Sequence, residues 1–205
     1  MIDNIDLLYE EQRLLMLYRY MIRKEYNINN HHKYENTNSL QNHMEMQQAI
    51  YLADSLLWTN QYGFVWDSHG PISPGLEANL NKIDKKKNEI VDFYSNFDGN
   101  IYSNDTINKL KFYYELSKIK YLEKFTKLTY DILKKPKGIE LLADLVYIGS
   151  KMLPGTKFEF VNKELQHLRP IFNNNDLNQF AFRCLEEFDL LEPIDYYKGE
   201  VKRLK

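Results

Sequence analysis

The sequence predicts a mainly α-helical protein with one small β element. Apolar residues recur at three- and four-residue steps through most of the chain, which is the period of a helix with one buried face. One aromatic stretch alternates at every second residue, as a half-buried strand does. The chain has 205 residues, 43% of them hydrophobic and 27% charged, which is long enough for one sizeable core. We therefore expect a single compact domain over residues 1–205.

Residues 1–43 are expected to hold an N-terminal helix and a polar loop. Apolar residues from Asn4 to Glu25 follow the helical period. The stretch from Asn27 to His43 is rich in Asn and His and has no period, so we interpret it as a long connection.

Residues 44–104 are expected to form a helix, a strand, a corner and another helix. A helix from about Glu45 to Trp58 carries its apolar residues on one face. In the short strand that follows, Phe64 and Trp66 lie on one side and Val65 on the other.

Gly70-Pro71 is expected to end this strand, because proline cannot donate to a ladder and disfavours helix in the residue before it. Ser73 followed by Pro74 predicts an N-cap and the first residue of a new helix. The residues that define this predicted structural motif are Tyr62, Phe64, Trp66, Gly70, Pro71, Ser73 and Leu76.

A lysine cluster and a second candidate strand follow this helix. The strand is expected at Ile90–Tyr94 and ends in a turn at Asp98. Helix, corner, strand and turn in this order indicate a winged-helix-like half with a two- to three-stranded β element.

Residues 105–191 are expected to form a C-terminal helical subdomain, a bundle, and residues 192–205 a polar tail. A long helix is predicted from Asp105 or Thr106 to Ile132. Three further helices are expected over Ile139–Met152, over Phe160–Leu168, and from a cap at Asp176 through Phe188.

Two ordered blocks of the sequence resemble a known bacterial family. The first block contains Met46–Leu52, Tyr62-Gly63-Phe64 and His69–Ser73 with Leu76, and the second contains Leu141–Ile148, Arg169-Pro170 and Cys184–Leu191. Together they resemble the signature of the YwgA-like family, which is similar to the Panacea (SocA-like antitoxin) domain. Gln48 stands where relatives commonly carry lysine.

The resemblance implies a small, winged-helix-like protein with no established catalytic constellation. Panacea relatives act as antitoxins that neutralise or deliver a partner protein, and many are carried on phages or other mobile elements.

Composition limits the classes of protein. No apolar run approaches the roughly 20 residues of a membrane span. The acidic N-terminus lacks the features of a secretory signal, so a cytoplasmic location is expected. The single cysteine, Cys184, falls in an apolar pattern with Phe180 and Phe188 and is interpreted as part of the core. The net charge of −2 disfavours avid, non-specific DNA binding.

Two clusters of reactive residue types are interpreted as surface and turn. His31, His32, Glu35 and His43 could ligate zinc, but their spacing matches no metal motif. Asp67, Ser68 and His69 have the residue types of a hydrolase triad, but neighbours on a strand point to alternating faces. We expect a turn in which Asp67 or Ser68 bonds the backbone, and a hydrolase site around His69 is disfavoured.

Lysines and tyrosines supply the remaining candidate contacts. The residues that could contact nucleic-acid phosphates are Lys82, Lys85, Lys86 and Lys87. Among 16 tyrosines, those at 18, 20, 113, 114, 121 and 130 cannot all point inward from two helices, so some are expected on a protein-contact surface.

The sequence therefore favours a non-enzymatic protein-binding regulator, antitoxin-like, that acts on a toxin or an immunity or defence protein. It contains no phosphate loop, dinucleotide fingerprint or metal motif, so no catalytic, cofactor or metal residues are assigned. The alternative is a winged-helix DNA-binding transcriptional regulator, with the helix from Ser73 to Ile83 in the groove.

Overall fold

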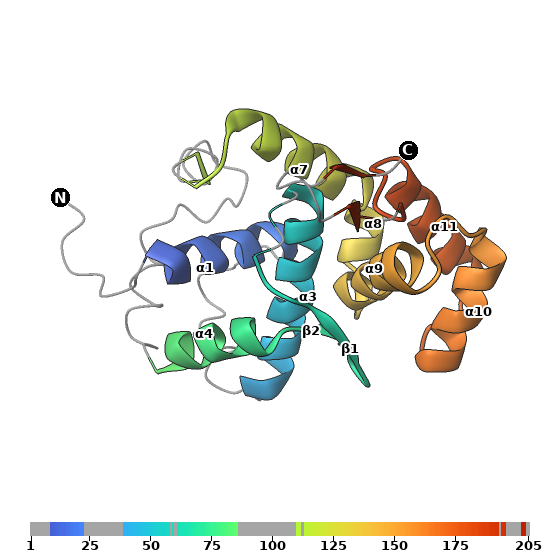
Figure 1. Cartoon of the computed structure of the whole chain (residues 1–205), viewed down its shortest axis with the longest axis horizontal. Helices are drawn as coiled ribbons and strands as arrows, with labels where there is room; N and C mark the ends of the chain where they lie inside the picture. Colours follow the sequence, from blue (N-terminus) through green and yellow to red (C-terminus); the bar gives the residue numbers. More distant parts are fainter. Residues whose placement is uncertain are drawn as a thin grey trace.

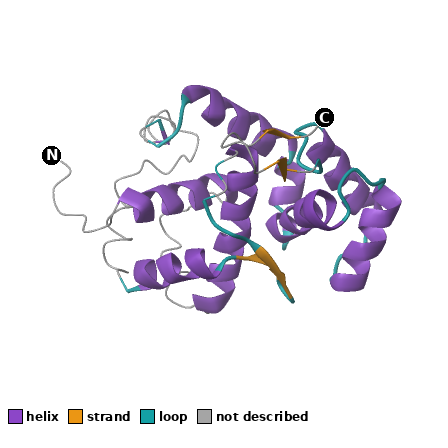
Figure 2. Cartoon of the chain, in the orientation of Figure 1, coloured by secondary structure: helices purple, strands orange, loops and turns teal. Residues whose placement is uncertain are grey.

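The computed structural model describes residues 9–22, 39–57, 59, 61–85, 110–111, 113–192, 194–195 and 202–203. This part of the chain is mainly helical, as the sequence predicts, and its strands form two short antiparallel pairs (Figure 2). The strand expected at Ile90–Tyr94, the turn at Asp98, and both Lys86 and Lys87 lie outside the described residues. So do His31, His32 and Glu35.

The elements follow one another in this order: α1 (Tyr9–Ile22), α3 (Ser39–Leu57), β1 (Val65–Asp67), β2 (Gly70–Ile72), α4 (Pro74–Asp84), α7 (Leu116–Leu128), α8 (Tyr130–Leu133), α9 (Gly138–Tyr147), the π-helical turn η2 (Ile148–Met152), α10 (Phe158–Leu168), α11 (Asn175–Glu186), β3 (Ile194–Asp195) and β4 (Lys202–Arg203). None of the described helices is both long and apolar enough to span a bilayer. The pairing of β3 with β4 adds structure to a segment that was expected to be only a polar tail.

Helix α3 is the central element, against which α1, α4, α7, α9 and β2 all pack (Figure 1). It begins at Ser39 instead of Glu45, so the end of the expected polar loop is helical. Every side chain from Met46 to Leu57 is buried, where the sequence predicts one apolar face. Neighbours surround the helix, and its polar residues must therefore find partners inside the protein.

The long helix predicted from residue 105 or 106 to Ile132 is wrong. Glu115 has an extended backbone, α7 begins only at Leu116, and a break at Thr129 separates α7 from α8. The Thr129 hydroxyl donates to the Phe125 carbonyl at 2.8 Å, a local bond of the kind that bends helices.

The C-terminal helices lie close to their predicted ranges, with different ends. The helix expected over Ile139–Met152 is α9, which continues into η2. The cap of α11 is Asn174, whose side chain accepts a bond from the Leu177 N–H at 3.0 Å, and not Asp176. Asn174 has the extended backbone that a capping residue requires, whereas Asp176 is already inside the first turn.

Candidate functional site

The predicted motif forms a β-hairpin, β1–β2, between α3 and α4 (Figure 1). Gly70-Pro71 was expected to end the strand, but both residues belong to β2 and pair with Asp67 and Trp66. Pro71 is tolerated there because it faces Trp66, a position at which the ladder does not require its missing N–H. The chain turns at Ser68 and His69 instead.

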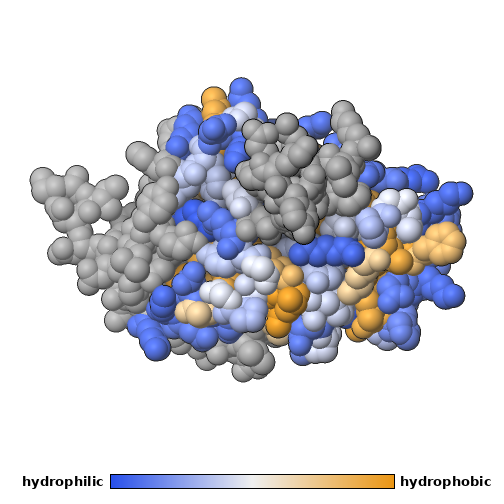
Figure 3. Space-filling model, viewed as in Figure 1, coloured by the Kyte–Doolittle hydropathy of each residue, from blue (hydrophilic) through white to orange (hydrophobic). Residues whose placement is uncertain are grey.

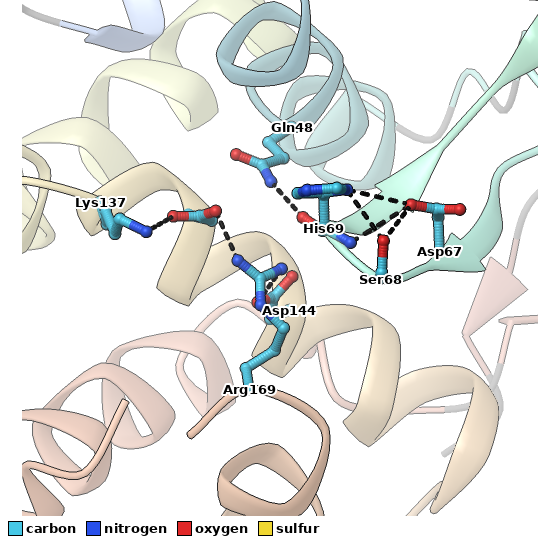
Figure 4. Close-up of polar contacts among 8 residues, drawn as sticks. Gln48, Asp67, Ser68, His69, Lys137, Asp144 and Arg169 are labelled. Atoms are coloured by element: carbon cyan, nitrogen blue, oxygen red, sulfur yellow. Dashed lines mark hydrogen bonds and ion pairs between the residues drawn. The ribbon is translucent and has the colours of Figure 1, made fainter. Parts of the chain in front are cut away.

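The tip of the hairpin brings together the three residues that sequence reasoning had separated. Asp67 Oδ1 accepts bonds from Ser68 Oγ at 2.9 Å and from the His69 N–H at 3.3 Å, and His69 Nδ1 lies 3.2 Å away (Figure 4). The alternation argument failed because Ser68 and His69 are turn residues and not strand residues. The backbone bond to Asp67 confirms the expected turn.

These contacts stabilise a turn, and their geometry differs from that of a catalytic triad. Bonds from Ser68 and then His69 lower the pKa of the Asp67 carboxyl from its usual value. The Asp67 and His69 side chains are about half exposed. His69 Nδ1 lies 2.9 Å from Ser68 Oγ and 3.2 Å from Asp67 Oδ1, so one ring nitrogen faces both residues. A catalytic triad instead needs the base between the nucleophile and the acid, beside an oxyanion-binding group.

Aromatic rings hold the base of the hairpin. Phe64 and Trp66 point inward, as predicted, and Val65 points outward with 51% of its surface exposed. Phe64 packs on Tyr51 of α3 with ring centroids 4.9 Å apart, and Trp66 packs on Tyr147 of α9 at 5.4 Å. The rings therefore attach the hairpin to α3 and α9, most of whose described side chains are buried.

Two of the motif's remaining residues face the core beside these rings. Tyr62 is buried, with its ring 6.3 Å from that of Phe64, and its hydroxyl accepts a bond from Asn79 of α4. Leu76 is fully buried, as expected for the inward face of α4.

Gly70 lies beside three buried polar side chains, those of Asp144, Arg169 and Gln48. Its φ of +107° suits glycine, and a Cβ placed there would overlap Asp144 Oδ1 and crowd Arg169 and Gln48. Gln48 of α3 donates to the His69 carbonyl at 2.8 Å, which fixes the residue before Gly70.

Asp144 and Arg169 form a charged pair beneath the hairpin. Asp144 of α9 is fully buried, and its Oδ2 lies 3.2 Å from Arg169 Nη1. Arg169 Nη2 also donates to Glu140 Oε1 at 2.5 Å, and Lys137 Nζ lies 3.6 Å from Glu140 Oε2. This network connects the residue that follows α10 to α9, and the sequence analysis did not predict it.

Burial raises the pKa of the Asp144 carboxyl well above its usual value, and the Arg169 guanidinium opposes that shift only in part. Within the described residues, neither oxygen of Asp144 accepts a hydrogen bond. The cause is desolvation, because the buried carboxylate of Asp144 is kept from water, which would otherwise stabilise its charged form.

The start of α4 is held by a second polar cluster. Ser73 caps the helix as predicted: its Oγ accepts from the Leu76 N–H at 3.2 Å, and its own N–H donates to Gln47 Oε1 at 2.7 Å. Gln47 also donates to Glu77 at 2.8 Å, and His43 Nδ1 lies 2.9 Å from the same carboxylate. His43 is therefore a buried helix residue, where the sequence predicted a solvated loop.

Of the residues considered as metal or thiol candidates, only His43 and Cys184 lie in the described part of the chain. Groups of three or more His, Cys, Asp or Glu side chains placed to hold a metal ion are absent from the residues that the structure describes. Cys184 is buried, as predicted, and desolvation raises the pKa of its thiol.

Of the four lysines assigned to possible phosphate contact, Lys82 and Lys85 are described and exposed. Lys82 Nζ lies 3.4 Å from Asn79 Oδ1. Of the tyrosines singled out in the sequence, Tyr130 is 47% exposed, while Tyr18 and Tyr20 are buried.

The most exposed large apolar side chain in the described part of the chain is Phe160 of α10, at 62%. Phe158 packs on Phe182, and Asn162 bonds to Asn178, so these residues mark the side of α10 that faces α11. Phe160 lies two residues from each, about 200° around the helix, and so points away from α11.

Phe180 of α11 lies two residues from Asn178 and Phe182, which face α10, so its side chain points away and is 45% exposed. Ile171, between the two helices, is 51% exposed. Apolar surface is visible at this end of the molecule (Figure 3). Sequence reasoning had placed Phe180 in the core. The sequence did contain a signal: Asn162 and Asn178, which face each other, lie two residues from Phe160 and Phe180 and so on the opposite helix faces.

Comparisons of this chain with protein-family models, with curated proteins and with solved structures return no match.

Proposed function

We propose that this chain is a non-enzymatic, protein-binding regulator of the antitoxin type, acting in the cytoplasm on a toxin or an immunity or defence protein of a bacterium, phage or other mobile element. The observation that carries the proposal is the exposure of Phe160 on a well-packed helix. Aromatic side chains are enriched in protein–protein interfaces, where a few of them supply most of the binding energy.

The setting of Phe160 supports this role. Helix α10 packs against α9, α11 and η2, so its outer face is held rigidly and little order is lost on binding. Met152 of η2 is 36% exposed and adds a flexible side chain of a kind common at adaptable interfaces. In the same proposal, α3, the β1–β2 hairpin and α4 form the winged-helix-like half.

The test compares three tagged full-length chains as baits in a lysate of the host cell: wild type, Phe160→Ser and Leu116→Ser. Leu116 is 47% exposed on α7, so its substitution is a matched control for loss of exposed apolar area. We expect wild type and Leu116→Ser to retain one stoichiometric protein. Phe160→Ser should bind it about 30-fold more weakly, as loss of a ~2 kcal/mol hot spot implies.

Equal capture by all three chains, or no stoichiometric protein with wild type, overturns the proposal. Because Phe160 is exposed, its substitution should leave the melting temperature unchanged, and this separates lost binding from lost folding.

DNA binding is the second candidate, and the exposure of Lys82 and Lys85 one turn apart at the end of α4 favours it. It requires steeply salt-dependent binding to duplex DNA, with a slope that falls by about 1 for each lysine changed to Gln. Binding that does not respond to either substitution removes this candidate.

A further inference from the structure

Among the residues that the structure describes, strand β1 has an open edge. Its partner β2 packs against α3 and α9, while β1 pairs with β2 alone among the described strands. Pro71 has no N–H, so Trp66 and Pro71 cannot be a hydrogen-bonded pair, and the ladder bonds must join Val65 to Ile72 and Asp67 to Gly70. The N–H and C=O of Trp66 therefore point away from β2.

The backbone groups that point outward from this edge differ in whether they have a hydrogen-bond partner. Within the described part of the chain, neither backbone group of Trp66 has a hydrogen-bond partner. The next outward carbonyl, that of Phe64, accepts a bond from Lys151 Nζ at 3.4 Å. An adjacent N–H and C=O on a strand edge match the backbone of another extended strand.

Opposite charges lie at the two ends of this edge. Lys151 of η2 is at the Phe64 end, and Asp67 is at the tip. Asp67 makes its described bonds through Oδ1, which leaves Oδ2 for another donor. An edge with a cation at one end and an anion at the other is complementary to itself when two copies run antiparallel.

We propose that β1 pairs antiparallel with β1 of a second copy of this chain, with Trp66 opposite Trp66 on the two-fold axis. The two hairpins then form one four-stranded sheet in the order β2, β1, β1, β2. Lys151 of each copy faces Asp67 of the other, and exposed Val65 adds apolar area beside the contact. The proposal uses β1 and not α10, so it does not depend on the proposed function.

The test measures the association of the full-length protein by sedimentation equilibrium over a range of concentrations at low salt. We expect a dimer of wild type. Asp67→Lys and Lys151→Asp should each weaken association about tenfold or more, since each places like charges at both ends of the edge. An equimolar mixture of the two variants should recover dimerisation, because opposite charges then face each other at both ends.

Phe160→Ser should dimerise like wild type, which separates this contact from the proposed partner surface. Far-UV circular dichroism of each single variant reports whether it is folded, and the mixture tests charge pairing with the same two chains. A wild type that is monomeric at every concentration overturns the proposal. So does a dimer that responds to neither charge reversal, or variants that fail to associate when mixed.

Discussion

At the residue scale, Gly70 is constrained both by its backbone conformation and by its close neighbours. A Cβ placed on it would meet the polar side chains of Asp144, Arg169 and Gln48, and its backbone has positive φ. The hairpin closes over the charged pair only because no Cβ intervenes. Backbone conformation and close approach therefore demand glycine independently.

Gly70→Ala is expected to lower the free energy of unfolding by about 3 kcal/mol, from backbone strain together with overlap on Asp144. Two alanine substitutions separate these causes. Gly155 has φ +68° with open space around it, so Gly155→Ala should cost only about 1 kcal/mol of strain. Gly63 has neither feature, so Gly63→Ala should cost little. Chemical denaturation of all three checks this, and equal losses at Gly70 and Gly155 would refute a role for the close approach.

At the element scale, local hydrogen bonds decide where helices start and stop. Ser73 begins α4 by capping the Leu76 N–H, and Asn174 begins α11 in the same way at Leu177. Thr129 interrupts a continuous apolar pattern by bonding back to Phe125. In each case a short polar side chain offers the backbone a bond that the regular helix does not.

Replacing Asn174 by Ala should destabilise the protein by about 1 kcal/mol, because the Leu177 N–H loses its acceptor. Asp176→Ala is the matched control. It removes only a favourable charge near the N-terminus of α11, worth about 0.5 kcal/mol or less at moderate salt. Thermal unfolding of both variants distinguishes them, and a larger loss at Asp176 would mean that the cap is misassigned.

At the scale of the whole molecule, two buried helices carry polar groups that join the parts of the fold. Gln48 of α3 holds the hairpin backbone, and Asp144 of α9 meets Arg169 at the end of α10. Breaking such a buried pair by removing one partner is costly, because the other charge is left behind. The orientation of these elements is therefore coupled to the protonation of Asp144.

The pKa of Asp144 is raised in the folded protein, so the folded state binds a proton that the unfolded state has lost. Stability should fall as pH rises from about 3.8, the ordinary carboxyl value, through the higher folded pKa. Asp144→Asn lacks this titration, so its stability relative to wild type should increase over the same range. Urea unfolding from pH 4 to pH 8 measures the difference. If the free energy of unfolding of wild type instead rises relative to that of Asp144→Asn as pH increases, attraction to Arg169 outweighs the cost of burial.

Local patterns were sufficient to predict helices near α1, α4, α9, α10 and α11, the inward side of Phe64 and Trp66, and the cap at Ser73. Each follows from the period of apolar residues or from one side chain and its nearest backbone groups. The expected turn at Asp67 also needed only adjacent residues.

Only the tertiary structure decided what surrounds those elements. Full burial of α3 depends on five neighbouring elements, and the Asp144–Arg169 pair joins residues 25 positions apart beneath a glycine from a third segment. Exposure of Phe160 depends on which side of α10 meets α11. The hydrophobic period by itself predicts that a helix has a buried face, but the elements that cover this face come from distant parts of the chain.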